Sequence, residues 1–125
     1  MAFSIEQLAQ AWEDHDGPAI FTTVDAAGVP NAVYVASVRV YGLECFVVAD
    51  NYFCKTRPNV QAGGVGSFLF RDKSGKTYQV KGRLSYHAAG PLFDFMKSWN
   101  GSKFPGHAAA ALSIEQVFSG ADQLL

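Results

Sequence analysis

The sequence predicts a mainly β domain, with a few short helices, in which six antiparallel strands close into a small barrel. Six segments are rich in β-branched and aromatic residues, and most of them are joined by links of hairpin length. Turn-forming runs such as Asp25-Ala26-Ala27-Gly28 and Asp72-Lys73-Ser74-Gly75 separate them. Strands linked in this way favour an antiparallel barrel over a doubly wound parallel sheet. We expect residues 1–125 to form a single domain.

A helix and a strand are expected first. The run Ser4-Ile5-Glu6-Gln7 is a capping-box pattern, and apolar residues continue at helical spacing as far as Trp12. A helix is therefore predicted over residues 4–14, and Asp16-Gly17-Pro18 ends it. The β-branched and aromatic residues 19–24 predict the first strand.

The longest expected strand covers residues 31–41 without interruption. Apolar residues occupy both of its faces, which indicates that both faces are covered. A turn at Gly42 leads into an apolar strand over residues 43–49. A short helix is predicted over residues 56–62, ended by Gly63-Gly64.

The C-terminal part is expected to contain a hairpin, a helix and a final strand. The hairpin strands cover residues 65–71 and 77–85. Gly90-Pro91 then opens a helix over residues 92–99, because proline is favourable in the first turn of a helix. Residues 109–118 predict the last strand.

The composition predicts a chain that associates with itself. Hydrophobic residues make up 49% and charged residues 17%, against about 25% charged in a typical soluble domain. Oligomers cover apolar surface of this kind, so a homodimer is expected. The net charge of −1 and the lack of an arginine-rich run argue against nucleic-acid binding. Neither a signal-peptide pattern nor roughly 18 consecutive apolar residues occur, so we expect a cytoplasmic protein that does not enter the membrane.

Metal sites and catalytic nucleophiles are not expected. His15, His87 and His107 are far apart in sequence and have no acidic companion at ligand spacing. Cys45 lies in an apolar strand and is interpreted as a small core residue, whereas Cys54 is interpreted as an ordinary thiol. No nucleophile motif is present, and no general acid or base stands out.

Lys55-Thr56 carries the strongest indication of a ligand site. It places a cation and a hydroxyl at the start of the predicted short helix, where backbone N–H groups have no partner within the helix. Phosphate groups bind to this combination of groups. The glycine-rich run Gly63-Gly64-Val65-Gly66 precedes a strand and not a helix, which excludes a dinucleotide-binding fingerprint there.

Several stretches, taken in order, resemble one known family. They are Gly28-Val29-Pro30-Asn31, Val47-Val48-Ala49-Asp50, Lys55-Thr56 with Asn59-Val60, Val80-Lys81-Gly82, and Gly90-Pro91-Leu92-Phe93. With their matching spacing over nearly the whole chain, they resemble the FMN-binding split-barrel family, which includes pyridoxamine 5′-phosphate oxidase. The short bacterial FMN-binding proteins of about this length are the most similar members.

The resemblance implies a homodimer of six-stranded barrels, with one FMN in each of two clefts at the interface. The strand that offers backbone hydrogen bonds to the isoalloxazine ring would comprise Val33, Tyr34, Val35, Ala36 and Ser37. The residues near the ribityl chain and phosphate would be Ala49, Asp50, Asn51, Lys55 and Thr56. Lys55 would pair with the phosphate, and Thr56 would donate its hydroxyl. The candidates for closing the site from the other subunit are Gln79 and Trp99.

The chain departs from the family pattern in three ways. Asp50 and Asn51 stand where a small or hydroxyl residue is common, and an inward-pointing Asp50 would repel a phosphate. Arg57 is the only further cation close to Lys55, where many members have more than one. The chain also lacks the C-terminal arginine-bearing segment that holds the substrate in pyridoxamine 5′-phosphate oxidase, so that activity is not expected.

The leading hypothesis is an FMN-binding flavoprotein that acts in electron or hydride transfer, as flavin reductases and oxidases do. One alternative is a split barrel that binds haem or a deazaflavin cofactor. Another is a cofactor-free dimeric interaction module whose apolar surface serves a protein partner. The redox partner or small-molecule substrate, and whether the protein is an enzyme, stay open on the sequence alone.

Overall fold

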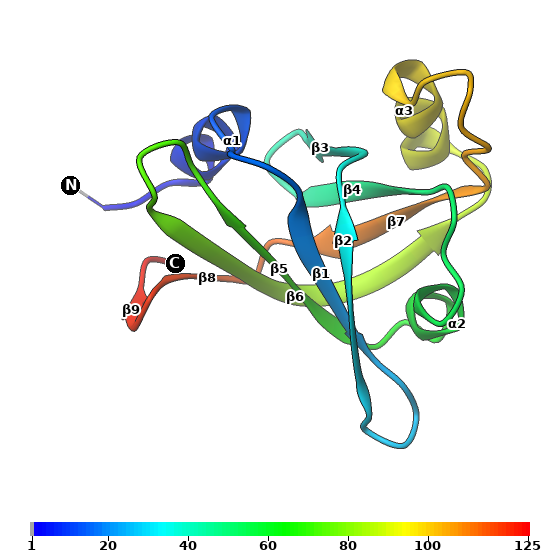
Figure 1. The fold of residues 1–125 in the computed structure, drawn as a ribbon, viewed down its shortest axis with the longest axis horizontal. Helices are drawn as coiled ribbons and strands as arrows, with labels where there is room; N and C mark the ends of the chain where they lie inside the picture. The colour runs from blue at the N-terminus through cyan, green and yellow to red at the C-terminus, as the bar shows by residue number, and fades with distance from the viewer. Residues whose placement is uncertain (1) are drawn as a thin grey trace.

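A computed structural model describes residues 2–125 of the chain (Figure 1). Its helices are α1 (Ile5–Glu13), α2 (Thr56–Gln61) and α3 (Pro91–Trp99). Its strands are β1 (Ala19–Val24), β2 (Pro30–Val35), β3 (Val38–Tyr41), β4 (Cys45–Asp50), β5 (Val65–Arg71), β6 (Thr77–His87), β7 (Ala108–Ser113), β8 (Gln116–Ser119) and β9 (Asp122–Gln123).

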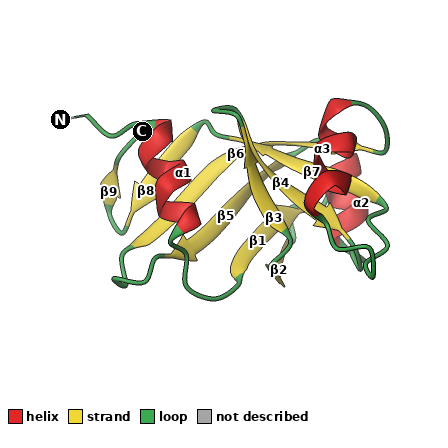
Figure 2. Ribbon diagram, turned by 90° about the horizontal axis from the view of Figure 1, so that it is seen from above, coloured by secondary structure: helices red, strands yellow, loops and turns green. Residues whose placement is uncertain are grey.

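The strands form one curled antiparallel sheet in the order β2-β1-β5-β6-β7-β4-β3, with β8 beside β6 and β9 beside β8. The long strand β6 joins its two halves, because residues 77–83 pair with β5 and residues 84–87 pair with β7. β2 and β3 lie at opposite ends of this order but are consecutive in the chain, so the sheet curls until its edges meet (Figure 2). The predicted antiparallel split barrel is confirmed.

The prediction of one uninterrupted strand over residues 31–41 is wrong. β2 pairs with β1, whereas β3 pairs with β4, and the chain changes from one sheet edge to the other at Ala36-Ser37. At this link the Ser37 carbonyl accepts a hydrogen bond from the Ala49 N–H at 2.9 Å. Both β2 and β3 have β-branched residues that pack toward the barrel interior. The apolar pattern of the sequence therefore continues from β2 into β3, although the two strands pair with different neighbours.

The predicted strand over residues 109–118 also divides, into β7 and β8. Between them the chain passes very close to β6: a Cβ atom built on Gly82 would lie 1.7 Å from the Ser113 carbonyl oxygen. With the short strand β9, the six predicted strands become nine in the described part of the chain. The barrel architecture is unchanged, because the extra strands come from divided segments and a terminal turn.

Aromatic side chains fill the interior of the barrel. Trp12 of α1 packs edge-to-face against three of them, at centroid separations of 5.2–6.0 Å: Phe46, Phe68 and Phe70. The predicted capping box positions α1, since the Ser4 hydroxyl accepts the Gln7 N–H and the Gln7 side chain accepts the Ser4 N–H. α1 thus contributes its apolar face to the main core.

A second core lies between α3 and the outer face of β4 and β7. All six residues of β4 are buried, because alternate side chains face the barrel interior and α3. The residues packed on the α3 side include Cys45, Val47, Ala49, Met96, Ala109 and Ala111. The core position predicted for Cys45 is confirmed, and burial raises the pKa of its thiol to about 11.

Candidate functional site

A cavity of about 480 Å³, called the β2 cavity below, lies between β2, the end of β4 and the loop that leads into α2. Small-molecule sites commonly have volumes of about 300–1,000 Å³. Its walls are mainly apolar, and the side chains of Asn31, Asn51, Lys55 and Thr56 supply polar groups. The arrangement suits a ligand with a flat apolar part and a charged or polar end.

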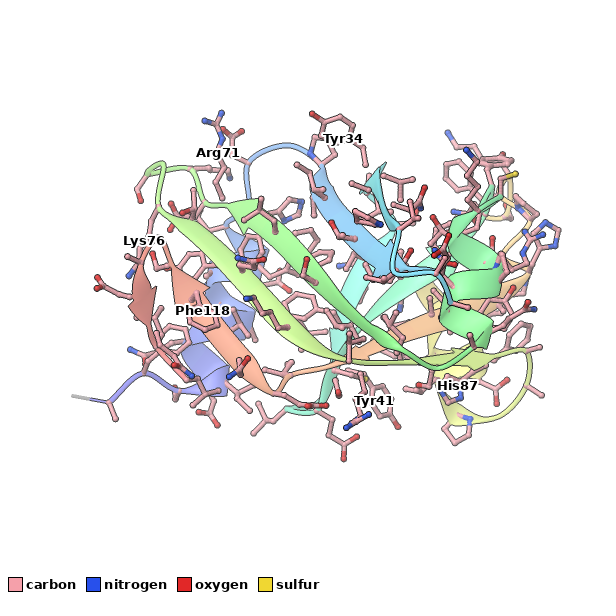
Figure 3. The ribbon with its side chains drawn as sticks, turned by 90° about the horizontal axis from the view of Figure 1, so that it is seen from below. Tyr34, Tyr41, Arg71, Lys76, His87 and Phe118 are labelled. Carbon is pink, nitrogen blue, oxygen red and sulfur yellow. The ribbon has the colours of Figure 1, made fainter. Side chains whose placement is uncertain are left out.

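β2 supplies one wall of the β2 cavity through an edge that pairs with no other strand. Within residues 2–125 it pairs only with β1, and the following Ala36-Ser37 link belongs to no strand. Edge strands present N–H and C=O groups that no neighbouring strand satisfies. This wall therefore offers main-chain hydrogen bonds to a bound molecule. Tyr34, on the same strand, points away from the barrel (Figure 3).

Lys55 and Thr56 form the polar end of the β2 cavity. Thr56 is buried, and its hydroxyl oxygen accepts a hydrogen bond from the Asn31 side-chain amide at 2.9 Å. Because the oxygen is the acceptor in this bond, the hydroxyl proton is left to be donated to a ligand. Lys55 is exposed and forms no ion pair with any described carboxylate. A cation and a hydroxyl donor thus lie side by side.

Asp50 does not line the β2 cavity. Its carboxylate is fully buried and accepts two hydrogen bonds from the Arg57 guanidinium, at 2.6 and 3.0 Å. The Tyr86 hydroxyl at 2.5 Å and the Phe53 N–H at 3.1 Å also donate to it. The repulsion that an inward-pointing Asp50 would cause is therefore avoided, but the charge of Arg57 is already neutralised by Asp50.

This hydrogen-bond network changes the ionisation of its members. Burial alone would raise the pKa of Asp50, but the hydrogen bonds from Arg57, Tyr86 and Phe53 outweigh it, so the pKa lies below its ordinary value. Burial and the hydrogen bond to Asp50 raise the pKa of Tyr86 to about 12. Asp50 is therefore ionised and Tyr86 neutral at pH 7. The network joins the end of β4 to α2 and β6.

Asn51 holds the opposite side of the β2 cavity together. It forms a reciprocal amide pair with Asn100, with N···O distances of 2.9 and 3.2 Å. The Gly106 N–H donates to the Asn51 side-chain oxygen at 3.0 Å, and the Asn51 amide donates to the Ser37 hydroxyl at 3.3 Å. These bonds connect β4 to the end of α3 and to the β2–β3 link, and they fix the wall between them.

The structure places most of the sequence-predicted cofactor residues around this one cavity. Those that line it are Val33, Tyr34, Val35, Ala36, Ser37, Ala49, Asn51, Lys55 and Thr56. Gln79 lies away from it, on β6 between Leu69 of β5 and Phe118 of β8, and lines another cavity. Trp99 lines a different, smaller cavity, and Asp50 is buried in its own network.

The β2 cavity also has lining residues outside the predicted set: Asn31, Tyr52, Phe53, Cys54 and Phe104. Asn31 is separated from Thr56 by 25 positions, and only the folded chain brings them together. Tyr52 and Phe53 lie just before Lys55 in the sequence, and this adjacency was the available signal. No local pattern links Phe104, in the loop after α3, to this site.

Comparisons with known proteins find similarity at the level of three-dimensional structure only. No family model matches the chain, and no curated protein matches it. HupZ from Group A Streptococcus superposes with a TM-score of 0.81 at 21% identity, over 95% of both chains. An FMN-binding protein from Syntrophomonas wolfei has a TM-score of 0.70 at 17% identity, over 94% of this chain and 86% of its own. HutZ, the haem storage protein of Vibrio cholerae, has a TM-score of 0.66 at 19% identity, over 95% of both chains.

These likenesses confirm the split-barrel resemblance at the level of the fold. The solved structures of this fold include a protein described as FMN-binding and one described as a haem storage protein. Among residues 2–125, no helix is both long enough and apolar enough to cross a membrane.

Proposed function

We propose that the chain is a cytoplasmic FMN-binding flavoprotein that acts in electron or hydride transfer. One observation carries the proposal: the unpaired edge of β2 and the Lys55-Thr56 pair belong to the same 480 Å³ cavity. FMN has a flat ring with hydrogen-bonding edges at one end and a phosphate at the other. The cavity provides a matching group for each part.

In this proposal the main chain of Val33–Ser37 pairs with the edge of the isoalloxazine ring, as the sequence resemblance implies. Lys55 and the Thr56 hydroxyl hold the phosphate, and the Asn31 amide keeps that hydroxyl oriented. Asn51 fixes the wall beside the ribityl chain. Bound FMN supplies hydride and single-electron chemistry, whereas these residues supply orientation and shelter from water.

A homodimer with the cofactor at its interface belongs to the same proposal. Lys55 is the only described cation on the β2 cavity, and a phosphate carries up to two negative charges. Tyr34 and Tyr52 are 76% and 74% exposed at its rim, although both are large aromatic residues. A second subunit would cover these rings and could complete the phosphate site.

Haem binding is the second candidate, because HutZ has the same fold and is described as a haem storage protein. Haem iron requires an axial ligand such as histidine, cysteine, methionine or tyrosine. Among the described residues that line the β2 cavity no histidine occurs, but Cys54, Tyr34 and Tyr52 carry groups that ligate haem. The lysine and the hydroxyl at the polar end would pair with a haem propionate as well as with a phosphate, so the test must include both cofactors.

An absorption spectrum of the purified protein, before and after addition of FMN and then of haem, tests the proposal. We expect a yellow protein with two broad visible bands and quenching of FMN fluorescence on titration. A Soret band that saturates at one haem per chain, with no response to FMN, would show that the cofactor is haem and not FMN. No response to either cofactor would leave a deazaflavin cofactor or the cofactor-free interaction module.

A further inference from the structure

A second cavity, of about 300 Å³ and called the Arg39 cavity below, adjoins the β2 cavity. It lies where the end of α1, the start of β3 and the end of α3 meet, and β3 runs between the two helices (Figures 1 and 2). Ala36, Ser37 and Phe104 belong to the walls of both cavities. The β2–β3 link thus separates two neighbouring spaces, of which the proposed function uses only one.

Arg39 provides an available cation in the Arg39 cavity. Its guanidinium lies over the ring of Trp99, with the central carbon 5.8 Å from the ring centroid. Within residues 2–125, no carboxylate oxygen comes within 4.0 Å of it. A guanidinium that stacks on an aromatic face keeps its N–H groups free in the plane, and these N–H groups match a carboxylate in geometry.

Aromatic side chains line part of the Arg39 cavity, beside polar groups that include Glu13, Ser37 and Asn100. The His15 ring stacks parallel to the Trp12 ring at 3.7 Å, and its Nδ1 donates to the Trp12 carbonyl oxygen, which fixes the ring in place. Trp99 and Phe104 also line the cavity. Rigid ring walls and a cation in so small a space suit a flat molecule that carries one acidic group.

We propose that the Arg39 cavity binds a small aromatic carboxylate, whose carboxylate group pairs with Arg39 while its ring lies among the aromatic walls. Glu13 lines the same cavity and is exposed. Its negative charge opposes a second acidic group, so the site takes monoanions in preference to dianions. If the proposed FMN function holds, such a ligand lies next to the flavin and belongs to the class of its redox substrates or products.

Benzoate is the probe for this inference, and benzamide is its neutral control of the same shape. Both tryptophans of the chain, Trp12 and Trp99, line the Arg39 cavity, so their indole N–H resonances and fluorescence report on it directly. We expect benzoate to shift both resonances in a saturable manner and benzamide to shift them far less. Equal responses to the two compounds, or no saturable response to benzoate, would overturn the proposal.

Substitutions then test the role of each charge. Arg39→Gln is expected to weaken benzoate binding roughly tenfold to a hundredfold, because it removes a charge-assisted hydrogen bond. Arg83→Gln, which changes the net charge equally but lies on β6 in another surface groove, should leave it unchanged. Glu13→Gln should strengthen binding, and it should also let a benzene dicarboxylate bind. Equal loss in the Arg39 and Arg83 variants would refute a specific site.

The carboxylate site in the Arg39 cavity and the proposed FMN function can be disproved independently of each other. Benzoate titration of the cofactor-free protein depends only on the Arg39 cavity, whereas FMN titration depends on the β2 cavity. Arg39→Gln should leave the FMN dissociation constant within about twofold of the original, since Arg39 does not line the β2 cavity. If benzoate binds but FMN does not, the carboxylate site stands and the flavin proposal falls.

Discussion

Lys55 and Arg57 are two positions apart in the sequence but differ in their electrostatic surroundings. Arg57 donates two hydrogen bonds to the buried Asp50 carboxylate, which neutralises its charge. Lys55 has no such partner among the described residues and lines the β2 cavity. The direction in which the Asp50 side chain points decides this difference. That direction depends on the hydrogen bond from Tyr86, which is 36 positions away in the chain.

Replacing Lys55 by alanine is expected to weaken FMN binding by about 1–3 kcal/mol, the range for a charge-assisted hydrogen bond. Isothermal titration or fluorescence quenching measures the change. Lys76→Ala is the matched control. Lys76 lies directly before β6, and its ammonium group lies over the Tyr78 ring, away from the β2 cavity. If the two variants bind FMN equally well, Lys55 has no part in the site.

The Asp50 network predicts how stability depends on pH. Asp50 has a lowered pKa, so its contribution to the free energy of unfolding is full above the ordinary carboxyl value and is lost as pH falls through its folded-state pKa. Tyr86 has a raised pKa of about 12, so its contribution is full below its ordinary value of 10.0 and is lost as pH rises toward about 12. Urea unfolding at a series of pH values measures both limbs.

Substitutions identify which residue causes the acid limb and which causes the alkaline limb of the dependence of stability on pH. Asp50→Asn should lower stability at pH 7 by about 2 kcal/mol and flatten the acid limb. The loss is smaller than for a fully buried pair, because the Arg57 side chain is 35% exposed to solvent. Tyr86→Phe should remove the alkaline limb and, because the Tyr86 hydroxyl also lowers the pKa of Asp50, flatten the acid limb in part. An acid limb that is as steep in Asp50→Asn as in the parent protein would contradict this assignment.

At the scale of elements, the link between β2 and β3 determines where ligands can bind. It carries the chain from one edge of the sheet to the other, and its two residues form part of the walls of both cavities. Ala36 and Ser37 have small side chains, which leave room on either side of the link. Sequence patterning did not predict the break, because the apolar alternation of β2 continues into β3.

The crossing of β6 by the β7–β8 connection depends on a glycine. Gly82→Ala would place a methyl group 1.7 Å from the Ser113 carbonyl oxygen, and this backbone atom cannot move without distorting β7. We expect a loss of about 3 kcal/mol or more, at the upper end of overpacking effects, measured by thermal or urea unfolding.

Gly64→Ala is the matched control for this change. Nothing lies within 4 Å of a Cβ atom built on Gly64, so its replacement should alter stability little. Similar unfolding midpoints for the two alanine variants would show that β6 and the β7–β8 connection are not in close contact.

At the scale of the whole molecule, the exposed aromatic residues favour association of two subunits around the β2 cavity. Tyr34 lies on the unpaired edge strand β2 and Tyr52 in the loop before α2, and both border the same space. The low proportion of charged residues supports the same conclusion. Oligomeric state and cofactor binding should therefore depend on each other.

Light scattering after size exclusion is expected to give a dimer of the 13.5 kDa chain. Tyr34→Glu should shift the population toward monomer and weaken FMN binding together, because it places a charge in the proposed interface. Leu43→Glu is the control at another exposed apolar residue, in the turn between β3 and β4. A monomer that binds FMN as tightly as the parent protein would separate the cofactor site from any interface.

The sequence by itself determined the features that depend on neighbouring residues. The capping box at Ser4, the helix that starts at Gly90-Pro91, the burial of Cys45 and the alternation of the strands all follow from short-range propensity and patterning. These features were enough to predict an antiparallel barrel. Most residues proposed for the cofactor were also found around one cavity, because they lie on consecutive segments of the chain.

Only the tertiary structure decided which groups are available to a ligand. It directed Asp50 into the network with Arg57 and Tyr86 and brought Asn31 to Thr56. It also divided two predicted strands where the sheet closes on itself. Each of these outcomes depends on contacts between residues distant in sequence, and local patterns carry no information about them.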